Sequence, residues 1–492
     1  MDNQLILERS GHPYGYEVEC TARLFFPGYK MLSPEQAEEK EAEQDRIDTS
    51  VTKSGGGVEL RVASRVGGDF REKVRMLPSS ATDQERERAL CTLLYELLCG
   101  QTGLRPPWGV LTGVRPVRLV HELLRTGKTW EEAERHFLEV YRATPEKTQL
   151  ALDTARVQQP LLEDNASGDF SLYIGIPFCP TRCLYCSFVS HAIDRTAKLI
   201  PEYLDKLCLE LEETGRIAGE LGLRLRTVYM GGGTPTTLEA EQLDRILGTV
   251  ADSFDLSGLS EYTVEAGRPD TLTVEKLAVL RRRGVERVSI NPQTLDDSVL
   301  REIGRAHTVE DFYRAFEMAR EQGFRVINTD LIAGLPTESA DGFLKGLERI
   351  IALRPENITV HTLTVKRSST LRERADAFLD TEEELTAALE ESRKLLAASG
   401  YGPYYLYRQK GTRQNLENVG YALPGAESRY NIYMMEEVQT VLAVGAGAVT
   451  KLCGAPGRLE RIFNFKYPYE YIGRFDEQLE RNDKIRRFYE AN

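Results

Sequence analysis

The sequence lacks long hydrophobic runs and an excess of positive charge. No apolar run approaches the ~20 residues needed to cross a bilayer, and residues 1–8 lack a basic region followed by an apolar core. We therefore expect a cytoplasmic protein without a membrane partner. The net charge of −13 disfavours a nucleic-acid partner, because such partners need a basic surface that displaces counterions.

Cysteine is also scarce, with only eight residues among 492. Five of them stand alone in apolar or mixed surroundings, which is typical of reduced thiols and not of a disulfide framework. These five are Cys20, Cys91, Cys99, Cys208 and Cys453. The sequence has no low-complexity tract and no solenoid repeat. A chain of this length exceeds what one core usually serves, so we expect two or three domains.

The other three cysteines, Cys179, Cys183 and Cys186, fall within eight residues. Three thiolates can bind three irons of a cubane cluster and leave the fourth iron open for chemistry. Zinc is the alternative metal, but it usually takes four protein ligands, and the nearest candidate, His191, lies five residues beyond Cys186. Three buried structural thiols are the other alternative, although chance rarely gathers three cysteines in one loop. We therefore interpret the loop as an iron–sulfur site.

The residues before about 165 indicate a small α+β domain. Segments 15–26 and 57–62 alternate apolar and polar residues, which predicts antiparallel strands. From Asp83 to about residue 162 the apolar residues recur at helical spacing. The polar segment 163–169 marks a boundary, so we predict an amino-terminal domain of unknown role over 1–165.

After this boundary, apolar strand-like runs alternate with amphipathic helical ones. The predicted strands are 172–177, 228–231, 262–266, 288–290, 326–334 and 358–365. The predicted helices are 198–222, 237–252, 272–283, 309–322 and 340–353. Strands separated by helices imply a parallel sheet, and polar motifs just past the strand ends favour an α/β partial barrel over 166–375. The repetition then stops, and we predict a helix-rich carboxyl-terminal domain over 376–492.

Polar and glycine residues follow several of these strands. The segment 231–236 reads Gly-Gly-Gly-Thr-Pro-Thr, whose missing side chains let backbone N–H groups approach a ligand. Glu265 could accept hydrogen bonds from an amino group, and Gln293 could bind a ribose or a carboxylate. Asp330 lies inside an apolar strand, where an unpaired carboxylate is costly, so a partner must exist. A satisfied core polar group explains each residue alone equally well, but their shared place at strand ends favours a ligand site.

The Cys-x3-Cys-x2-Cys loop, with Tyr185 before its last cysteine, resembles that of the radical S-adenosylmethionine enzymes. The runs 172–179 and 231–236 are similar to those of the oxygen-independent coproporphyrinogen III oxidase branch of this family. The resemblance covers about residues 171 to 450. It implies a partial (β/α)6 barrel with a coproporphyrinogen-oxidase-like carboxyl-terminal domain.

The resemblance also implies the cofactors. Cys179, Cys183 and Cys186 would hold a 4Fe-4S cluster, and Tyr185 and Glu265 would lie at the catalytic centre. The residues that would line two S-adenosylmethionine sites are Tyr173, Tyr185, Gly232, Gly233, Thr234, Glu265, Gln293, Arg305, Asp330 and Thr364. The spacing of Gln293, Arg305 and Asp330 follows the family pattern without a gap.

Two positions depart from the family pattern. Gly175 stands where the family often has histidine, and Phe188 stands where its best-studied form carries a further cysteine. The pair Ser187-Phe188 and the additional amino-terminal domain look like the long variant found in some Gram-positive bacteria. The related haem-chaperone branch shares much of the cluster region, typically with Asp-Phe after the last cysteine.

The resemblance implies oxidative decarboxylation of coproporphyrinogen III to protoporphyrinogen IX by a deoxyadenosyl radical, in haem biosynthesis. The alternatives are a haem chaperone and another radical reaction on a tetrapyrrole. A reductant such as flavodoxin or ferredoxin would be a partner, and we expect a monomer. The substrate carboxylates also need cations, for which solvated surface positions are an equal explanation. The candidates are Lys366, Arg367, Arg408, Lys410 and Arg413.

Overall fold

The computed structural model describes residues 3–36, 44–186, 190–364, 381–409, 416–454 and 457–490. The chain divides into two compact units, one formed mainly by Met1–Leu152 and one formed by Asp153–Arg413 and Glu417–Asn492. The three-domain division with boundaries near residues 165 and 375 stays a prediction. Within the described ranges, no helix combines the length and the apolar character needed to span a bilayer.

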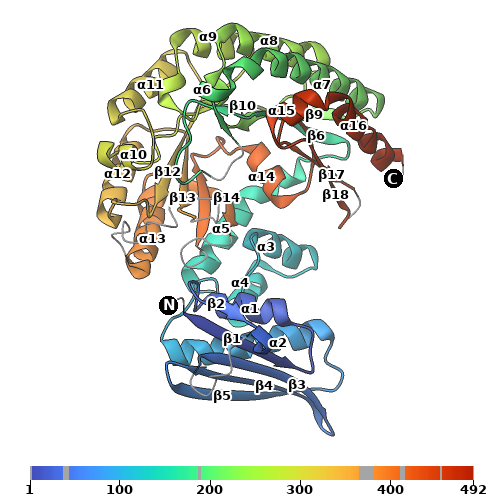
Figure 1. Cartoon of the computed structure of the whole chain (residues 1–492), viewed down its shortest axis with the longest axis vertical. Coiled ribbons are helices and arrows are strands. Elements are labelled where there is room, and N and C mark those ends of the chain that lie inside the picture. Colours follow the sequence, from blue (N-terminus) through green and yellow to red (C-terminus); the bar gives the residue numbers. More distant parts are fainter. Residues whose placement is uncertain are drawn as a thin grey trace. The chain divides into compact units, whose positions relative to one another are not determined.

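The first unit is a five-stranded sheet with helices packed against it (Figure 1). In spatial order its strands are β2 (Lys30–Leu32), β1 (Gln4–Ser10), β3 (Arg46–Ser54), β4 (Gly57–Val66) and β5 (Asp69–Leu77). Its helices are α1 (Gly15–Arg23), α2 (Asp83–Thr102), α3 (Pro116–Arg125) and α4 (Trp130–Glu139), and α5 (Pro145–Glu163) follows. Apolar side chains of β4, α1 and α2 form one core, so the predicted α+β character of this part of the chain is confirmed.

The strand predicted at 15–26 is wrong, because Gly15–Arg23 form helix α1. Apolar and polar residues alternate at the start of this segment, but the buried side chains are Val18, Thr21 and Ala22, which share one face of a helix. Packing of that face in the core outweighs the short alternation. The strand predicted at 57–62 is confirmed as β4, which pairs antiparallel with β3 and β5.

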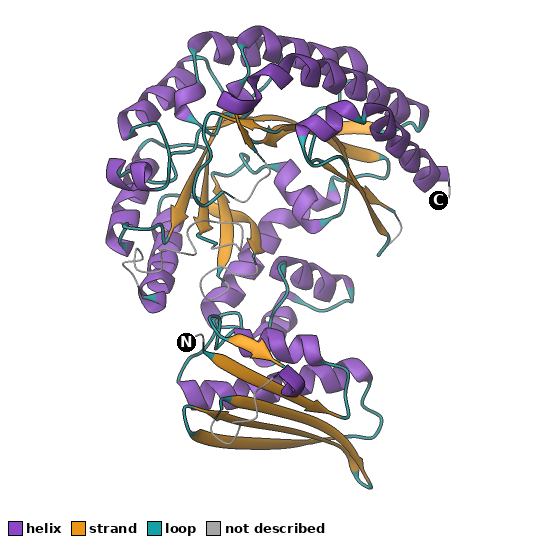
Figure 2. Cartoon of the chain, viewed as in Figure 1, coloured by secondary structure: helices purple, strands orange, loops and turns teal. Residues whose placement is uncertain are grey.

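The second unit is built on one large sheet whose central strands run parallel. In spatial order these strands are β13 (Asn357–Thr362), β12 (Val326–Ala333), β11 (Arg287–Ser289), β10 (Glu261–Glu265), β9 (Arg224–Gly232) and β6 (Asp169–Ile176). Each of these six strands pairs in parallel with the next of the six along the chain, as βαβ units require. Figure 2 shows the sheet as a curved wall with helices on its outer side. All six predicted strands and the α/β partial barrel are confirmed.

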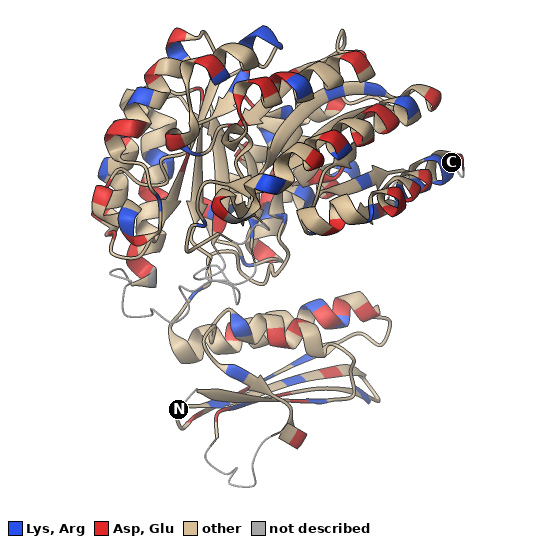
Figure 3. Ribbon diagram, turned by 45° about the horizontal axis from the view of Figure 1, so that its top comes forward, with Lys and Arg blue, Asp and Glu red and all other residues tan. Residues whose placement is uncertain are grey.

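Amphipathic helices cover the outer side of this wall. They are α7 (Ile200–Glu220), α8 (Ala240–Ser253), α9 (Val274–Arg282), α10 (Asp297–Glu302), α11 (Val309–Glu321) and α12 (Ala340–Ala352). Helix α8 is representative, since it buries Leu243, Ile246, Leu247 and Val250 at three-to-four spacing. Acidic and basic residues are interspersed along these helices (Figure 3). The five predicted helices correspond to α7, α8, α9, α11 and α12.

The carboxyl-terminal region is rich in helices, as predicted, and it also extends the sheet at both ends. Its helices are α13 (Glu382–Ala398), α14 (Arg429–Glu436), α15 (Pro468–Gly473) and α16 (Phe475–Glu490). Five further strands are β14 (Gly402–Arg408), β15 (Glu417–Ala422), β16 (Thr440–Val444), β17 (Val449–Cys453) and β18 (Leu459–Phe463). Strand β15 pairs antiparallel with β13, whereas β16 pairs parallel with β6 on the opposite side of the sheet.

Helix α14 lies against the inner side of the wall. Its amino terminus meets the start of β10, where the buried carboxylate of Glu261 accepts hydrogen bonds from the Ser428 hydroxyl at 2.8 Å and from the Arg429 backbone N–H at 2.6 Å. Tyr430 of α14 stacks on Tyr229 of β9, with 4.4 Å between the ring centroids. Helix α14 therefore lies close to the inner faces of β9 and β10, the strands that lead to the predicted site.

Candidate functional site

A cavity of about 420 Å³ lies beside the cysteine loop on the inner side of the sheet. It is lined by residues from the carboxyl ends of the parallel strands, where barrel folds place their reactive groups. Every predicted cluster or cofactor residue except Tyr173 lines it. These residues are Cys179, Cys183, Tyr185, Cys186, Gly232, Gly233, Thr234, Glu265, Gln293, Arg305, Asp330 and Thr364. Tyr173 is one layer behind, and its ring stacks on the cavity-lining Tyr229 with 6.3 Å between the centroids.

The cysteine loop is anchored at both ends and in its middle. Cys179 ends the short strand β7 (Phe178–Cys179), which pairs with β8 (His191–Ala192). The backbone N–H of Leu184 donates to the carbonyl of Ile303 at 3.0 Å. Leu184 and Tyr185 also pack against the apolar cluster that includes Ile303. These protein contacts hold the loop against the barrel.

The donor set of the loop fits a cubane cluster. Cys179, Cys183 and Cys186 are half-buried and line one cavity. Among the described residues, no three His, Cys, Asp or Glu side chains converge as they would around a single metal ion. In a cubane cluster each thiolate binds a different iron, so the sulfur atoms do not have to converge on one point.

The glycine motif brings the end of β9 close to the loop. The backbone N–H groups of Gly233 and Thr234 donate to the carbonyls of Ile176 and Phe178, both at 2.7 Å. A Cβ atom on Gly233 would lie 2.5 Å from the Phe178 carbonyl oxygen, so only glycine allows this approach. The Thr234 hydroxyl then lies 3.5 Å from the Cys179 sulfur, to which it donates a hydrogen bond.

Glu265 ends strand β10 inside the cavity. Its Oε1 accepts a 2.6 Å hydrogen bond from the Tyr229 hydroxyl, and its Oε2 accepts a 3.3 Å bond from the Gly232 backbone N–H. Burial raises the pKa of Glu265 to about 7, the negative charge of Asp330 adds to the rise, and the Tyr229 hydrogen bond opposes it. This carboxyl group therefore changes its charge near neutral pH.

Asp330 has the partners that its position in an apolar strand requires. The side-chain amides of Asn291 and Asn328 each donate to its carboxylate at 2.8 Å, and His361 Nε2 lies 3.7 Å away. Burial alone would raise the pKa of Asp330, but the contacts with His361 and Asn328 outweigh burial and lower it. Asp330 therefore stays ionised and can accept hydrogen bonds from a ligand.

Gln293 and Arg305 connect the strand ends to the loop. Gln293 adopts a left-handed backbone with φ 70°, and its N–H and C=O bond to the Asp330 carbonyl and the Ile332 N–H at 3.0 and 2.9 Å. A non-glycine residue persists in this conformation only where its surroundings impose it. Arg305 is buried and donates to the Tyr185 hydroxyl from Nε and Nη2, at 3.2 and 3.1 Å. These bonds fix Tyr185 of the cysteine loop to the barrel.

Several cavity residues were not predicted from the sequence. Tyr229, Asn291, Asn328, His361 and Arg268 all line the cavity. The signal for Asn328 is its place two residues before Asp330 in β12, because alternate residues of a strand share one face. The signal for Arg268 is weaker, since it follows the end of β10 by three residues and reaches the site only through the turn described below.

The structure describes one of the five predicted carboxylate-binding cations, Arg408. Lys366, Arg367, Lys410 and Arg413 lie outside the described residues. Arg408 is buried at the end of β14, and it is not among the residues that line the cavity. Burial lowers the pKa of Arg408 to about 10, against the effect of the Glu417 carboxylate.

Comparison with known proteins places this geometry in a family. Residues 173–350 match the radical SAM superfamily, whose members use a 4Fe-4S cluster and S-adenosylmethionine. The chain is 41% identical over 393 residues to the oxygen-independent coproporphyrinogen-III oxidase-like protein HemZ of Bacillus subtilis, a match that covers 79% of this chain and 78% of that protein. It is 33% identical over 287 residues to the heme chaperone HemW of Lactococcus lactis, covering 58% of this chain and 70% of that protein.

The fold agrees with the sequence comparison. The structure is similar to that of coproporphyrinogen III oxidase (HemN) from Escherichia coli, with a TM-score of 0.51 and 24% identity over 66% of this chain and 73% of that chain. The parallel sheet, the cysteine loop at its carboxyl edge and the extent of the identity to HemZ lead to one assignment. The chain belongs to the radical SAM superfamily, in the oxygen-independent coproporphyrinogen III oxidase branch and close to its long HemZ-type variant.

Proposed function

We propose that this protein catalyses the oxygen-independent oxidative decarboxylation of coproporphyrinogen III to protoporphyrinogen IX. The observation that carries the proposal is the single cavity in which the cysteine loop faces Glu265, Gln293 and Asp330. Such a cavity brings a co-substrate and a substrate side chain within reach of the same reacting carbon. The identity to a protein named as coproporphyrinogen oxidase-like supports the choice of substrate.

Cys179, Cys183 and Cys186 would hold the cluster. Once bound, the cluster supplies the electron that cleaves S-adenosylmethionine to the deoxyadenosyl radical. The remaining residues bind and orient. Glu265, when ionised, accepts hydrogen bonds from the amino group of the co-substrate, next to the backbone N–H groups of the glycine motif. Asp330 accepts hydrogen bonds from hydroxyl groups, because its carboxylate stays ionised.

The walls of the cavity protect a radical from water. Tyr405 and Tyr407 of β14 lie on one side, and the apolar side chains of Ile332 and Leu363 lie near the loop. Aromatic rings and aliphatic side chains take up space that water would otherwise occupy on these sides of the cavity. Control of side reactions by a shaped site is the contribution that a protein makes to cofactor chemistry.

A haem chaperone is the second candidate, because the chain is also similar to a protein of that name. His361 is the observation in the site that bears on it, since it lines the cavity and an imidazole is a common iron ligand. We place this function second because the HemZ match covers more of the chain. For the oxidase we propose a flavodoxin or a ferredoxin as electron donor, and a monomer as the working unit.

An anaerobic assay separates the two candidates. The reconstituted protein is incubated with coproporphyrinogen III, S-adenosylmethionine and a reductant, and the products are separated by chromatography. The oxidase produces protoporphyrinogen IX together with deoxyadenosine, and the Cys183→Ala variant produces neither. Stoichiometric haem binding without any turnover of coproporphyrinogen III would contradict the oxidase function and support the chaperone function.

A further inference from the structure

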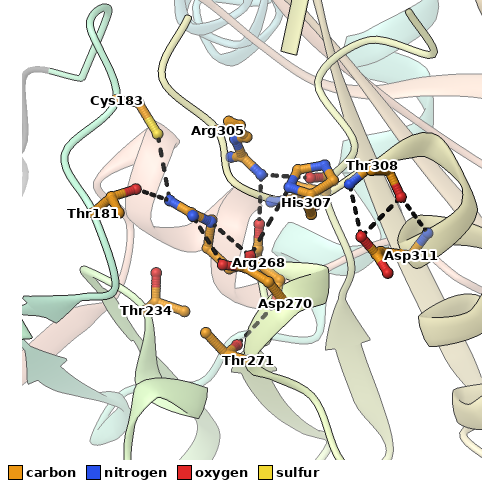
Figure 4. A network of polar contacts seen from close by, with 12 residues as sticks. Thr181, Cys183, Thr234, Arg268, Asp270, Thr271, Arg305, His307, Thr308 and Asp311 are labelled. Carbon is orange, nitrogen blue, oxygen red and sulfur yellow. Dashed lines mark hydrogen bonds and ion pairs between the residues drawn. The ribbon is translucent and has the colours of Figure 1, made fainter. Parts of the chain in front are cut away.

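Arg268 lies between the end of β10 and the cysteine loop, and its side chain makes four hydrogen bonds to protein atoms (Figure 4). The residue is only 3% exposed. Its Nε and Nη2 donate to the two oxygens of Asp270, each at 3.0 Å. Its Nη1 donates to the Thr181 hydroxyl at 3.1 Å and to the Cys183 sulfur at 3.7 Å. The guanidinium group therefore connects a carboxylate on one side to the loop on the other.

The local sequence explains how Arg268 comes to this place. It precedes Pro269, which restricts the preceding residue to extended conformations, and its φ and ψ are −127° and 105°. The short 3-10 helix η5 (Pro269–Thr271) then turns the chain so that Asp270 meets the guanidinium group. The Thr271 hydroxyl donates to the Arg268 carbonyl at 2.7 Å, and the Lys276 ammonium donates to the Thr271 carbonyl at 3.2 Å. Backbone and side chain are thus both held.

This arrangement differs from that of a ligand clamp. A clamp for a carboxylate or phosphate presents the paired N–H groups of its fork to the ligand. In Arg268 the fork formed by Nε and Nη2 is occupied by Asp270, and both hydrogens of Nη1 have acceptors in the loop. The cation is therefore aimed at the Cys183 sulfur, with the neutralising carboxylate on its far side.

A cation and an N–H donor at a cluster sulfur favour the reduced cluster, which carries one more negative charge. Hydrogen bonds to the sulfur atoms and nearby charge are among the factors that set iron–sulfur potentials. The effect is large where the charge is buried, because screening by water is weak there. Groups behind the metal ligands also fix the ligands' orientation.

We propose that Arg268 is a positioning residue that raises the reduction potential of the cluster and holds the Cys183 segment of the loop, with Asp270 and Thr181 as its supports. The proposal requires the cluster that the family uses, and it does not require coproporphyrinogen III as substrate. Its test therefore uses no turnover, so that its failure and the failure of the proposed function are distinguishable.

The test is a redox titration of the anaerobically reconstituted full-length protein, followed by the electron paramagnetic resonance signal of the reduced cluster. In Arg268→Gln we expect the equilibrium constant for reduction of the cluster to fall at least tenfold. For a one-electron couple this lowers the reduction potential by about 59 mV. Arg268→Lys keeps the charge but cannot make the same four contacts, so its reduction potential should lie between those of the wild type and Arg268→Gln. An unchanged potential in Arg268→Gln at full iron content overturns the proposal.

The matched control is Arg283→Gln. Arg283 donates in the same two-pronged way to Asp244, with both distances 2.7 Å, but it does not line the cavity. The Arg283→Gln substitution should leave the reduction potential of the cluster unchanged. If Arg268→Gln binds no cluster, the reduction potential of Arg268→Lys tests the proposal in its place. If neither variant binds iron, an unchanged melting temperature supports the holding role, and a general loss of thermal stability overturns the proposal.

Discussion

The hydroxyl of Tyr229 donates a 2.6 Å hydrogen bond to Oε1 of Glu265. Burial raises the pKa of this carboxyl group to about 7. Below this pH the carboxyl group is protonated and cannot attract the ammonium group of S-adenosylmethionine. We therefore predict that co-substrate binding strengthens by up to tenfold per pH unit between about pH 5 and 7 and then levels off. Equilibrium binding measured anaerobically at a series of pH values tests this.

Two variants make the pH prediction specific. Glu265→Gln removes the titrating group, so its binding should be weaker and independent of pH in this range. Tyr229→Phe removes the hydrogen bond that favours the ionised form, so its profile should move to higher pH. A wild-type profile that is flat between pH 5 and 7 would show that Glu265 does not bind the ammonium group.

The cysteine loop yields a prediction about the metal. Replacement of Cys179, Cys183 or Cys186 by Ala should abolish the broad visible absorbance of the reconstituted protein, because an iron then lacks its thiolate. Cys20→Ala and Cys453→Ala should leave the absorbance intact. The measurement is an absorption spectrum with iron and sulfide analysis. An equal loss in either scattered-cysteine variant would sink the assignment.

Substitution of Asp330 should weaken binding of the co-substrate and leave binding of the cluster unchanged. The Asp330 carboxylate accepts from Asn291 and Asn328 but retains acceptor capacity toward the cavity. Since hydrogen bonds to charged groups contribute about 1.5–3 kcal/mol, Asp330→Asn should weaken S-adenosylmethionine binding by roughly 10- to 100-fold. The cluster spectrum should stay at the wild-type level. The idea fails if binding is unchanged, or if the spectrum is lost together with binding.

His307 should make stability depend on pH. It is buried, neither ring nitrogen has a hydrogen-bond partner within the described structure, and burial lowers its pKa to about 4. The pKa of His307 is about 6.5 in the unfolded chain and about 4 in the folded chain. The free energy of unfolding therefore keeps its full value above pH 6.5 and decreases as the pH falls toward 4. The shift corresponds to about 3 kcal/mol.

Chemical denaturation at a series of pH values measures this contribution. In His307→Phe the part of the pH dependence that belongs to the imidazole should disappear, so the difference between the two proteins should grow steadily from pH 6.5 to 4. Parallel stability curves for wild type and variant would contradict the prediction. The comparison removes the effect of the carboxylates that titrate in the same range.

The order of elements from β6 to β13 could be predicted because each is specified locally. Val326–Ala333 is a short apolar run, and α8 places its apolar residues on one face. The candidate site was predicted from the same pattern, since Glu265 ends the apolar strand β10 and Asp330 is a carboxylate within the apolar strand β12. These positions need no knowledge of distant contacts.

Other features depend on tertiary contacts that leave no local pattern. Helix α1 begins with an alternation typical of strands, and only packing in the core decides its form. The role of Arg268 depends on the return of the cysteine loop to the end of β10. The pairing of β16 with β6 joins segments at opposite ends of the second unit, and nothing in Thr440–Val444 indicates its partner.

The position of β16 also has a consequence for biosynthesis. Strand β6 leads into the cysteine loop, and Ser171 pairs with Val441, so one edge of β6 stays open on the ribosome until Thr440–Val444 has been made. An open strand edge can pair with another chain, and a nascent chain must avoid this. The strand that leads into the cysteines therefore gains its second neighbour only after Thr440–Val444 has been synthesised.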